Sequence, residues 1–448
     1  MGSQSCRDTR SGVRKPLYFT LPKSFEPLDY LKTLKLQMRA DDARWFIDTI
    51  VRKTANRIVD DKGCVRLDSQ ILKSVMHKHT YAEVIGSLED GGVVESLSYS
   101  VKNKMTGYRL SMKFLSEQHK RVLATDPRLI ERAFASLENP RHYSDQQQNL
   151  DPIHVALNAE QQRLSISDEA DEVLQTINPK AILCQDCLIG NIRRKDFPFT
   201  VSSTGRVFNA ITGLKKVLRK TVRLDGKPIA SVDLRCAQPA FLALLIEQTA
   251  AAAGQKQSLR GVRCRGRGEP GAGRGERARE QPRNQNLICI PIVPYLGGEF
   301  CQETAMSEDF KTYKSLVCSG EFYPELARIT GMDIGYVKHD FIVDVLAKNV
   351  VKCGDYPSPV ESAFAGAFPS VFRVIKKARE SELSVIGLLQ KMESSMVIHG
   401  VCKKLIGSVP CVTVHDEVYS TCDCICDVEK AFYSTFDDIG FSMAVKRS

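Results

Sequence analysis

The stretch from Val409 to Ser420 reads VPCVTVHDEVYS, with short apolar runs on both sides of His415-Asp416-Glu417. Runs rich in β-branched residues around a polar turn predict two strands joined by a tight hairpin. A third strand is predicted from Lys227 to Leu234 (KPIASVDL), and a helical stretch, Pro239 to Leu245, follows it. Strands and helices of this kind predict an α+β fold with an antiparallel sheet.

The predicted strands end on carboxylates. Asp233 closes the strand at 227–234, and Asp416 and Glu417 lie in the hairpin. Carboxylates held side by side on a sheet form an oxygen-rich site that suits Mg²⁺, and a pair of such ions can support phosphoryl transfer. A single strand-terminal aspartate often only caps a turn, so the prediction depends on the pair.

With their surroundings, these motifs resemble the palm and fingers of family A DNA polymerases. Asp233 resembles the first catalytic aspartate, and Val414 to Glu417 (VHDE) resembles the third catalytic motif. The other similar motifs are the TGR-like Ser203 to Arg206 (STGR), the fingers-like Tyr336 to Phe341 (YVKHDF) and the glutamine-bearing Leu388 to Ser394 (LLQKMES). The resemblance covers residues 200 to 440, roughly, in the order of the family.

The resemblance implies a role for each matching residue. Those implied for metal binding and catalysis, with two Mg²⁺ ions, are Asp233, Asp416, Glu417 and the Leu234 carbonyl. Those implied for the incoming dNTP are Lys338, Gln238 and Phe341, although Phe341 and Val345 are equally compatible with core packing. Those implied for the DNA primer–template are Arg206, Gln390 and His415.

The chain departs from the family pattern at two positions. Gln238 stands where an acidic residue usually excludes the 2′-hydroxyl, so weaker rejection of ribonucleotides is expected. Ile334 stands where the fingers helix usually has an arginine. No acidic set typical of a proofreading exonuclease is visible in residues 1–200. The pattern indicates a compact, exonuclease-free polymerase of the kind that a phage or another mobile element carries.

Residues 41–115 predict a winged-helix-like module. Asp68 and Thr80 can cap two helices, and two strands flank a basic turn with Lys102 and Lys104, which would contact DNA. A small α+β packing module that touches no DNA fits the same pattern. The other predicted segments are a flexible basic N-terminus at 1–40, a helical, thumb-like connector at 116–200, and a palm and fingers at 201–448 with a disordered Arg/Gly-rich insertion at 251–285.

Composition sets limits on these expectations. The net charge of the 448 residues is +10, but residues 256–283 carry nine Lys or Arg against three Glu, which leaves only +4 elsewhere. The longest apolar runs are too short to cross a membrane. No secretory signal is visible, and the fifteen cysteines then predict thiols in the cytoplasm. The CQDC pair, Cys184 and Cys187, has zinc-ligand spacing but no second pair nearby.

Three functions fit the sequence. The first is a template-directed DNA polymerase, with replication accessory proteins as possible partners. The second is a catalytically inactive replication-initiation or DNA-binding protein with a polymerase-like palm. The third, a Mg²⁺-dependent nuclease, leaves Lys338 and the STGR stretch unexplained.

Overall fold

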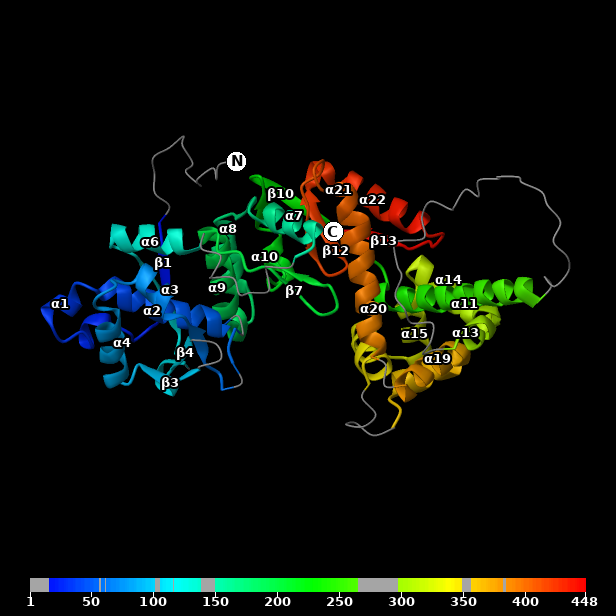
Figure 1. The fold of residues 1–448 in the computed structure, drawn as a ribbon, viewed down its shortest axis with the longest axis horizontal. Helices are drawn as coiled ribbons and strands as arrows, with labels where there is room; N and C mark the ends of the chain where they lie inside the picture. The colour runs from blue at the N-terminus through cyan, green and yellow to red at the C-terminus, as the bar shows by residue number, and fades with distance from the viewer. Residues whose placement is uncertain are drawn as a thin grey trace. The chain divides into compact units, whose positions relative to one another are not determined.

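The computed structural model describes residues 16–55, 58–60, 62–100, 105–115, 117–137, 150–264, 297–348, 356–381 and 384–448. The chain is mixed α+β with small antiparallel sheets (Figure 1). It divides into two compact units. The first unit comprises residues 1–149, 165–198 and 213–221, and the second comprises 150–164, 199–212 and 222–448.

The first unit contains short strands and ten helical segments among its described residues. In chain order they are β1 (Tyr18–Pro22), η1 (Pro27–Asp29), α1 (Leu34–Gln37), α2 (Ala40–Ala55), β2 (Val65–Leu67), α3 (Ser69–Val75), α4 (Tyr81–Asp90), β3 (Val94–Ser100), β4 (Met105–Leu110), α5 (Met112–Leu115), β5 (His119–Leu123), α6 (Pro127–Leu137), α8 (Glu169–Thr176), α9 (Pro179–Arg194) and α10 (Lys216–Arg219). The strand β6 (Leu164–Ile166) lies where the chain passes between the units.

The segment at 18–40 belongs to the core of the first unit, which corrects the prediction of a flexible tail at 1–40. β1 pairs antiparallel with β5, and α2 packs against β1. Phe19 and Leu21 are fully buried. Because alternate residues of a strand face the same side, the spacing of these apolar residues gives β1 a buried face.

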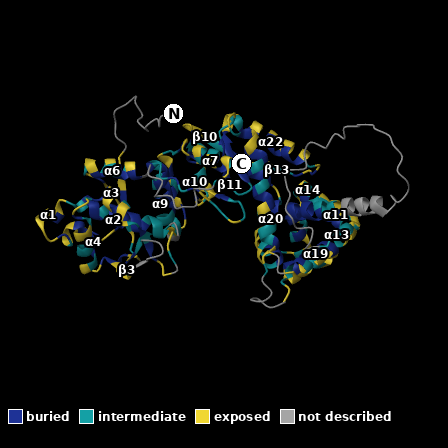
Figure 2. Ribbon diagram, viewed as in Figure 1, coloured by how far each residue is buried: buried dark blue, intermediate teal, exposed yellow. Residues whose placement is uncertain are grey.

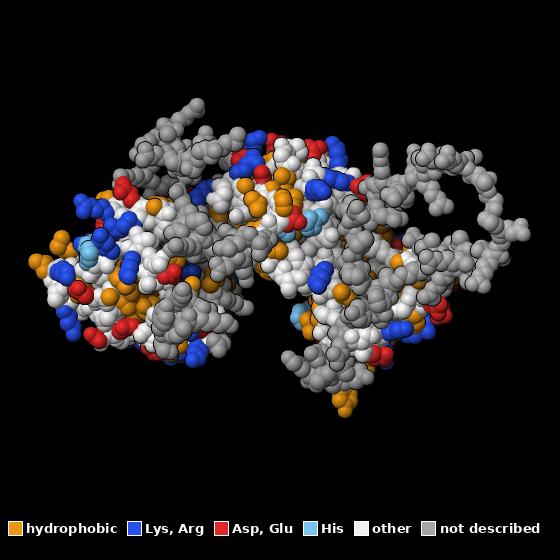
Figure 3. All heavy atoms as spheres, in the orientation of Figure 1, with side chains coloured by type: hydrophobic (Ala, Val, Ile, Leu, Met, Phe, Trp, Pro, Cys, Tyr) orange, Lys and Arg blue, Asp and Glu red, His pale blue; other side chains and the backbone are white. Residues whose placement is uncertain are grey.

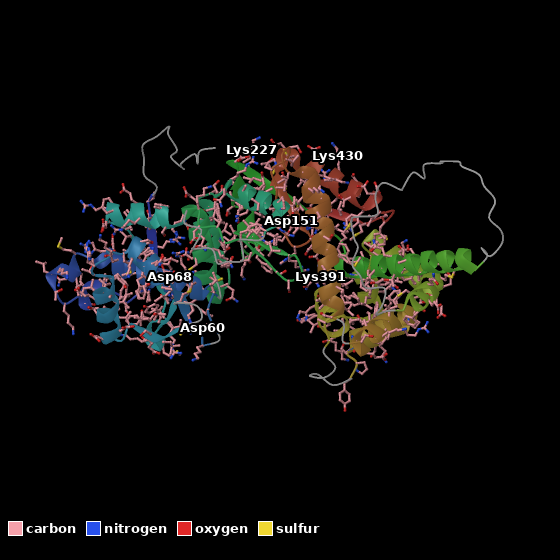
Figure 4. All side chains as sticks on the ribbon, in the orientation of Figure 1. Asp60, Asp68, Asp151, Lys227, Lys391 and Lys430 are labelled. Carbon is pink, nitrogen blue, oxygen red and sulfur yellow. The ribbon has the colours of Figure 1, made fainter. Side chains whose placement is uncertain are left out.

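The predicted helix and strand order at 41–115 is observed. Its elements run α2, β2, α3, α4, β3, β4, and the sheet order is β2-β4-β3. The Asp68 side chain caps α3 by accepting from the Gln70 amide at 2.8 Å. Thr80 does not cap α4, because its hydroxyl lies 3.1 Å from His77 Nδ1 instead. Figure 4 labels Asp68 at the start of α3.

The connector predicted at 116–200 is not a separate body. Most of its described residues belong to the first unit, including α6, α8 and α9. Cys184 and Cys187 both lie on α9. Burial raises the pKa of the Cys187 thiol, which disfavours the thiolate that a zinc site requires.

The second unit holds the remaining elements. They are α7 (Pro152–Gln161), β7 (Thr200–Val201), β8 (Val207–Phe208), β9 (Val222–Leu224), β10 (Lys227–Leu234), α11 (Ala237–Cys264), α13 (Gly298–Met306), α14 (Glu308–Ser319), α15 (Phe322–Thr330), α16 (Ile334–Asp340), the π-helix η4 (Phe341–Leu346), α18 (Pro359–Ala367), α19 (Pro369–Glu380), α20 (Val385–Ser394), the π-helix η5 (Ser395–Cys402), α21 (Lys403–Leu405), β11 (Val412–Val414), β12 (Glu417–Thr421), η6 (Cys422–Cys424), α22 (Ile425–Asp437) and β13 (Val445–Arg447).

A small antiparallel sheet and a helical bundle form the second unit. β12 lies between β11 and β10, and β10 also pairs with β9 and β13. The first part of α11 is buried and packs against α13, α14 and α20 (Figure 2). α11 extends to Cys264, so the predicted disordered insertion at 251–285 begins with helix, as its run of alanines favours. Residues 265–285 lie outside the described residues.

No helix in the described ranges is both long and apolar enough to cross a membrane.

The buried carboxyl of Asp42 makes the first unit sensitive to pH. Its side chain is 1% exposed, accepts from the His77 amide at 3.3 Å and lies 3.9 Å from Arg132 Nη2. Burial raises the pKa of Asp42 to about 6, opposed by the His77 amide and by the charges of Arg132 and Arg39. The native state therefore binds this proton more tightly than the unfolded chain does.

Between pH 4 and pH 6 the free energy of unfolding should fall as pH rises, by up to about 3 kcal/mol from this group. Asp42→Asn keeps an acceptor for the His77 amide and should remove that part of the pH dependence. Urea unfolding at pH 4 and pH 7 can be followed by the fluorescence of Trp45, the single tryptophan, which lies on α2. Equal pH dependence in the two proteins would contradict the assignment.

Candidate active site

Strand pairing brings the two predicted aspartates to one end of the sheet. β10 and β12 pair antiparallel with Asp233 opposite Glu417. β11 and β12 form a hairpin in which Val414 pairs with Glu417, so His415 and Asp416 form its two-residue turn. His415 has a φ of 58°, a left-handed conformation that is common in tight turns. Asp416 therefore lies one residue from the partner of Asp233.

A buried carboxylate from α20 lies beside this pair. Glu393, with 1% side-chain exposure, accepts from Arg206 Nε and Arg206 Nη2 at 2.8 Å each. The amide nitrogen of Gln238 donates to the same carboxylate. Lys391, two residues earlier on α20, is exposed (Figure 4). The fork of two hydrogen bonds holds Arg206 and Glu393 in one relative orientation.

The loop between β7 and β8 carries Arg206 to α20. Gly205 in this loop has a φ of 80°, and a Cβ added to it would lie 3.3 Å from Ser394 Cβ. Glycine is favoured here both by the left-handed backbone and by the close approach to α20. The backbone amide of Arg206 donates to Ser202 Oγ at 3.1 Å. The STGR stretch is thus a tight turn that aims its arginine at Glu393.

The three carboxylates influence one another electrostatically. Burial raises the pKa of Asp416, and the Glu393 carboxylate raises it further, against the opposing charges of Arg206 and Lys338. Burial also raises the pKa of Glu393, and Asp233 adds to this, against Arg206 and Gln238. Like charges held this close favour a bound cation or a shared proton.

Lys338 is a second cation whose charge acts on Asp416. It lies on α16, is exposed, and its Nζ is 5.8 Å from the centroid of the Tyr323 ring. The Asp416 charge contributes to raising the pKa of Tyr323, although burial is the larger cause. The structure therefore brings together four sequence-predicted residues: Asp233, Asp416, Lys338 and Arg206.

Two other predicted residues serve as supports for the sheet end. Glu417 is buried and accepts a hydrogen bond from Ser231 Oγ at 2.6 Å, so its carboxylate links β12 to β10. The His415 ring meets the Phe208 ring at a centroid distance of 5.6 Å. Leu234 ends β10 and is buried. Its role as a carbonyl ligand stays a prediction.

Phe341 occupies the core rather than a nucleotide-facing surface. It is fully buried, with its ring centroid 4.9 Å from that of Phe322 and 5.1 Å from that of Phe364. Val345, one turn further, is also fully buried. The packing alternative for this pair is therefore the observed one, and the physical reason is the aromatic cluster contributed by α15 and α18.

Glu393, rather than Gln390, makes the contacts with the predicted arginine. Gln390 is partly buried and lies one turn before Glu393 on α20. The two residues are on the same helix face, but in the described part of the chain only Glu393 bonds to Arg206 and Gln238. Ser231 and Tyr323 were not predicted. Ser231 could have been found from the sequence, because it lies two residues before Asp233 and so on the same face of the strand. No local pattern in the sequence distinguishes Tyr323. Lys102 and Lys104 lie outside the described residues.

The donor set suits Mg²⁺ in its chemistry. Asp233 and Asp416 supply hard carboxylate oxygens, and a divalent cation would offset the burial and the Glu393 charge that raise the pKa of Asp416. Within the described ranges, no three His, Cys, Asp or Glu side chains are already grouped as a metal site. Two aspartates would therefore provide the protein ligands, with substrate phosphates and water completing the shell.

The first unit has a separate cavity of about 540 Å³. Arg121 and Arg193 line it, and both pair with Asp171, at 3.0 Å and 2.9 Å. Arg121 also pairs with Asp186. Four basic and three acidic side chains line this cavity, so its excess charge is small, and we place the candidate site at Asp233 and Asp416.

No protein-family model matches this chain, and a search of the curated proteins finds no match.

Proposed function

We propose that this chain is a template-directed DNA polymerase that transfers a nucleotidyl group from a dNTP to a primer 3′-hydroxyl. The observation that carries the proposal is the convergence of Asp233, Asp416, Lys338 and Arg206 at one end of the sheet. Two carboxylates beside two cations can hold both metal ions and the phosphates that those ions bind.

In this reaction Asp233 and Asp416 would hold two Mg²⁺ ions. When bound, the ions supply Lewis-acid activation of the primer hydroxyl and charge stabilisation of the departing pyrophosphate. Lys338, exposed at the last turn of α16, would neutralise the triphosphate. Glu417, through Ser231, would keep β10 and β12 in register so that the aspartates stay adjacent.

The Arg206–Glu393 pair favours the second candidate, a DNA-binding protein with an inactive polymerase-like palm, because it engages an arginine that a polymerase would use at the primer–template. The resemblance implies that Arg206 meets the primer–template, yet its guanidinium is already engaged by Glu393. In a polymerase, Arg206 would instead hold α20 in position through Glu393. The guanidinium N–H groups that do not bond to Glu393 would then be the ones that contact DNA. Gln238 is held by the same carboxylate, so the expected weaker rejection of ribonucleotides remains a prediction.

The first unit supports a nucleic-acid role less directly. Its order α2, β2, α3, α4, β3, β4 and its sheet order are compatible with a winged-helix module. However, the solvent-facing side of α4 carries Glu83, Glu89 and Asp90, which phosphates would repel. We therefore propose that α4 is not inserted into a DNA groove.

A primer-extension assay tests the proposal. Purified chain, a 5′-labelled primer on a longer template, dNTPs and Mg²⁺ should give lengthened primers, and omission of one dNTP should stop synthesis at the corresponding template base. Binding without extension would reject the polymerase and support the second candidate. Primer shortening would indicate the nuclease instead.

A further inference from the structure

A stripe of uncompensated cations lies on α19, in the helical bundle of the second unit. Arg373, Lys376 and Lys377 stand on its outward side, at spacings of three and four residues that place them on one face. Figure 3 shows Lys and Arg side chains gathered over this helix. In the described part of the chain, none of the three forms an ion pair with an acid. Glu380, at the end of the same helix, pairs with none of them.

Another cation of the same helix, Arg379, is compensated by an acid. Arg379 turns inward and pairs with the buried Glu361 at 2.8 Å. Some exposed cations on other helices in the described residues are also compensated, as in Lys430 with Asp427 and Lys311 with Glu308. The outward cations of α19, three against the exposed Glu380 on the same helix, are therefore a local excess of positive charge.

Aromatic rings hold these cations in place. Lys377 Nζ lies 4.5 Å and Arg373 Cζ lies 5.7 Å from the centroid of the Phe300 ring. Lys376 Nζ lies 5.8 Å from the centroid of the Phe372 ring. A cation stacked on a ring loses less rotamer freedom when it binds an anion, because its side chain is already ordered.

The spacing suits a chain of phosphates. Arg373 and Lys377 are four residues apart, which is about 6 Å along the helix axis. One nucleic-acid strand rises about 3.4 Å per phosphate, so the stripe spans two or three successive phosphates. The chain's own residues 265–296 are not the occupant, since they carry six arginines against three glutamates and would be repelled.

We propose that the α19 stripe, Arg373, Lys376 and Lys377, binds the phosphate backbone of a nucleic-acid strand at a place distinct from the candidate active site. This binding does not depend on the proposed catalysis. It supplies an anchoring surface that a strand can occupy whether or not nucleotidyl transfer takes place.

The test compares two triple variants of the full chain that carry the same change of net charge. The first is R373Q/K376Q/K377Q. The control is K311Q/R328Q/K430Q, which removes three exposed cations that each pair with an acid on their own helix; Lys430 is labelled in Figure 4. Fluorescence anisotropy with labelled single-stranded and duplex oligonucleotides is measured from 0.1 M to 1 M salt.

The salt slope is the slope of the logarithm of the binding constant against the logarithm of the salt concentration. If the stripe binds phosphates, the magnitude of this slope for single strands should be smaller by about 2 in the first variant, since each lost contact contributes about 0.7. A slope difference of 2 means that its relative affinity loss is about 100-fold greater at 0.1 M salt than at 1 M. The control should keep the wild-type slope. Duplex should show a loss nearer 2.7 if the stripe meets duplex phosphates.

The proposal is overturned if the first variant binds with the wild-type slope, or if the control loses as much as the first variant does. Equal competition by poly-glutamate would also overturn it, in favour of an acidic protein partner. A chain that binds through α19 but never extends primers would reject the proposed function while supporting this surface.

Discussion

Replacing Asp416 with asparagine is expected to lower primer extension by a factor on the order of 10³ or more, because the carboxylate that we propose as a metal ligand is lost. The stability of the fold should not fall. Burial and Glu393 raise the pKa of Asp416, so its ionised form destabilises the metal-free protein. The neutral asparagine should therefore leave the melting temperature unchanged or raise it, a combination that separates a functional residue from a structural one.

Metal binding gives this prediction a second readout. Mg²⁺ that binds the native state should raise the melting temperature of the wild type and not that of Asp416→Asn. Asp427→Asn is the control, because it removes an exposed carboxylate paired with Lys430 and should change neither extension nor the Mg²⁺ effect. Full extension by Asp416→Asn would reject the assignment of this residue, and stabilisation of both proteins by Mg²⁺ would place the metal elsewhere.

Local patterns were sufficient to predict the strands that carry the aspartates. The observed β10 has the same bounds as the predicted strand at 227–234, and the hairpin turn falls at His415 and Asp416. Alternation and turn chemistry act over a few residues, so they can be read without knowing distant partners. The alternation around Phe19 was an equally local signal, and the prediction of a flexible tail overlooked it.

The rest of the site depends on partners far away in the chain. Arg206 and Glu393 are 187 residues apart, and the choice of Glu393 over Gln390 follows from where the loop at Gly205 meets α20. The burial of Phe341 similarly follows from aromatic residues on other helices. Helical periodicity gives a face, but it does not say whether that face meets the core or a ligand.

The buried charge cluster at Glu361 should have the largest effect on the stability of the second unit. Glu361 is 3% exposed, and its carboxylate accepts from Lys348 Nζ at 2.6 Å and from Arg379 Nη1 at 2.8 Å. Arg379 Nη2 also donates to the Val345 carbonyl at 2.6 Å. The cluster thereby joins α18 and α19 to η4, the π-helix that continues α16 and its Lys338.

Glu361→Ala leaves two buried cations without their carboxylate, which should cost roughly 3–5 kcal/mol of unfolding free energy. Urea unfolding followed by far-ultraviolet circular dichroism measures the loss. Glu325→Ala is the matched control, since its pair with Arg328 is exposed and water screens it, so the change should be far smaller. Because η4 is held by Arg379, Glu361→Ala should also weaken the proposed interaction of Lys338 with the triphosphate and raise the KM for dNTP more than it lowers kcat. Similar stabilities for the two variants would show that Lys348 and Arg379 find other partners or water, and that η4 is held by its apolar contacts alone.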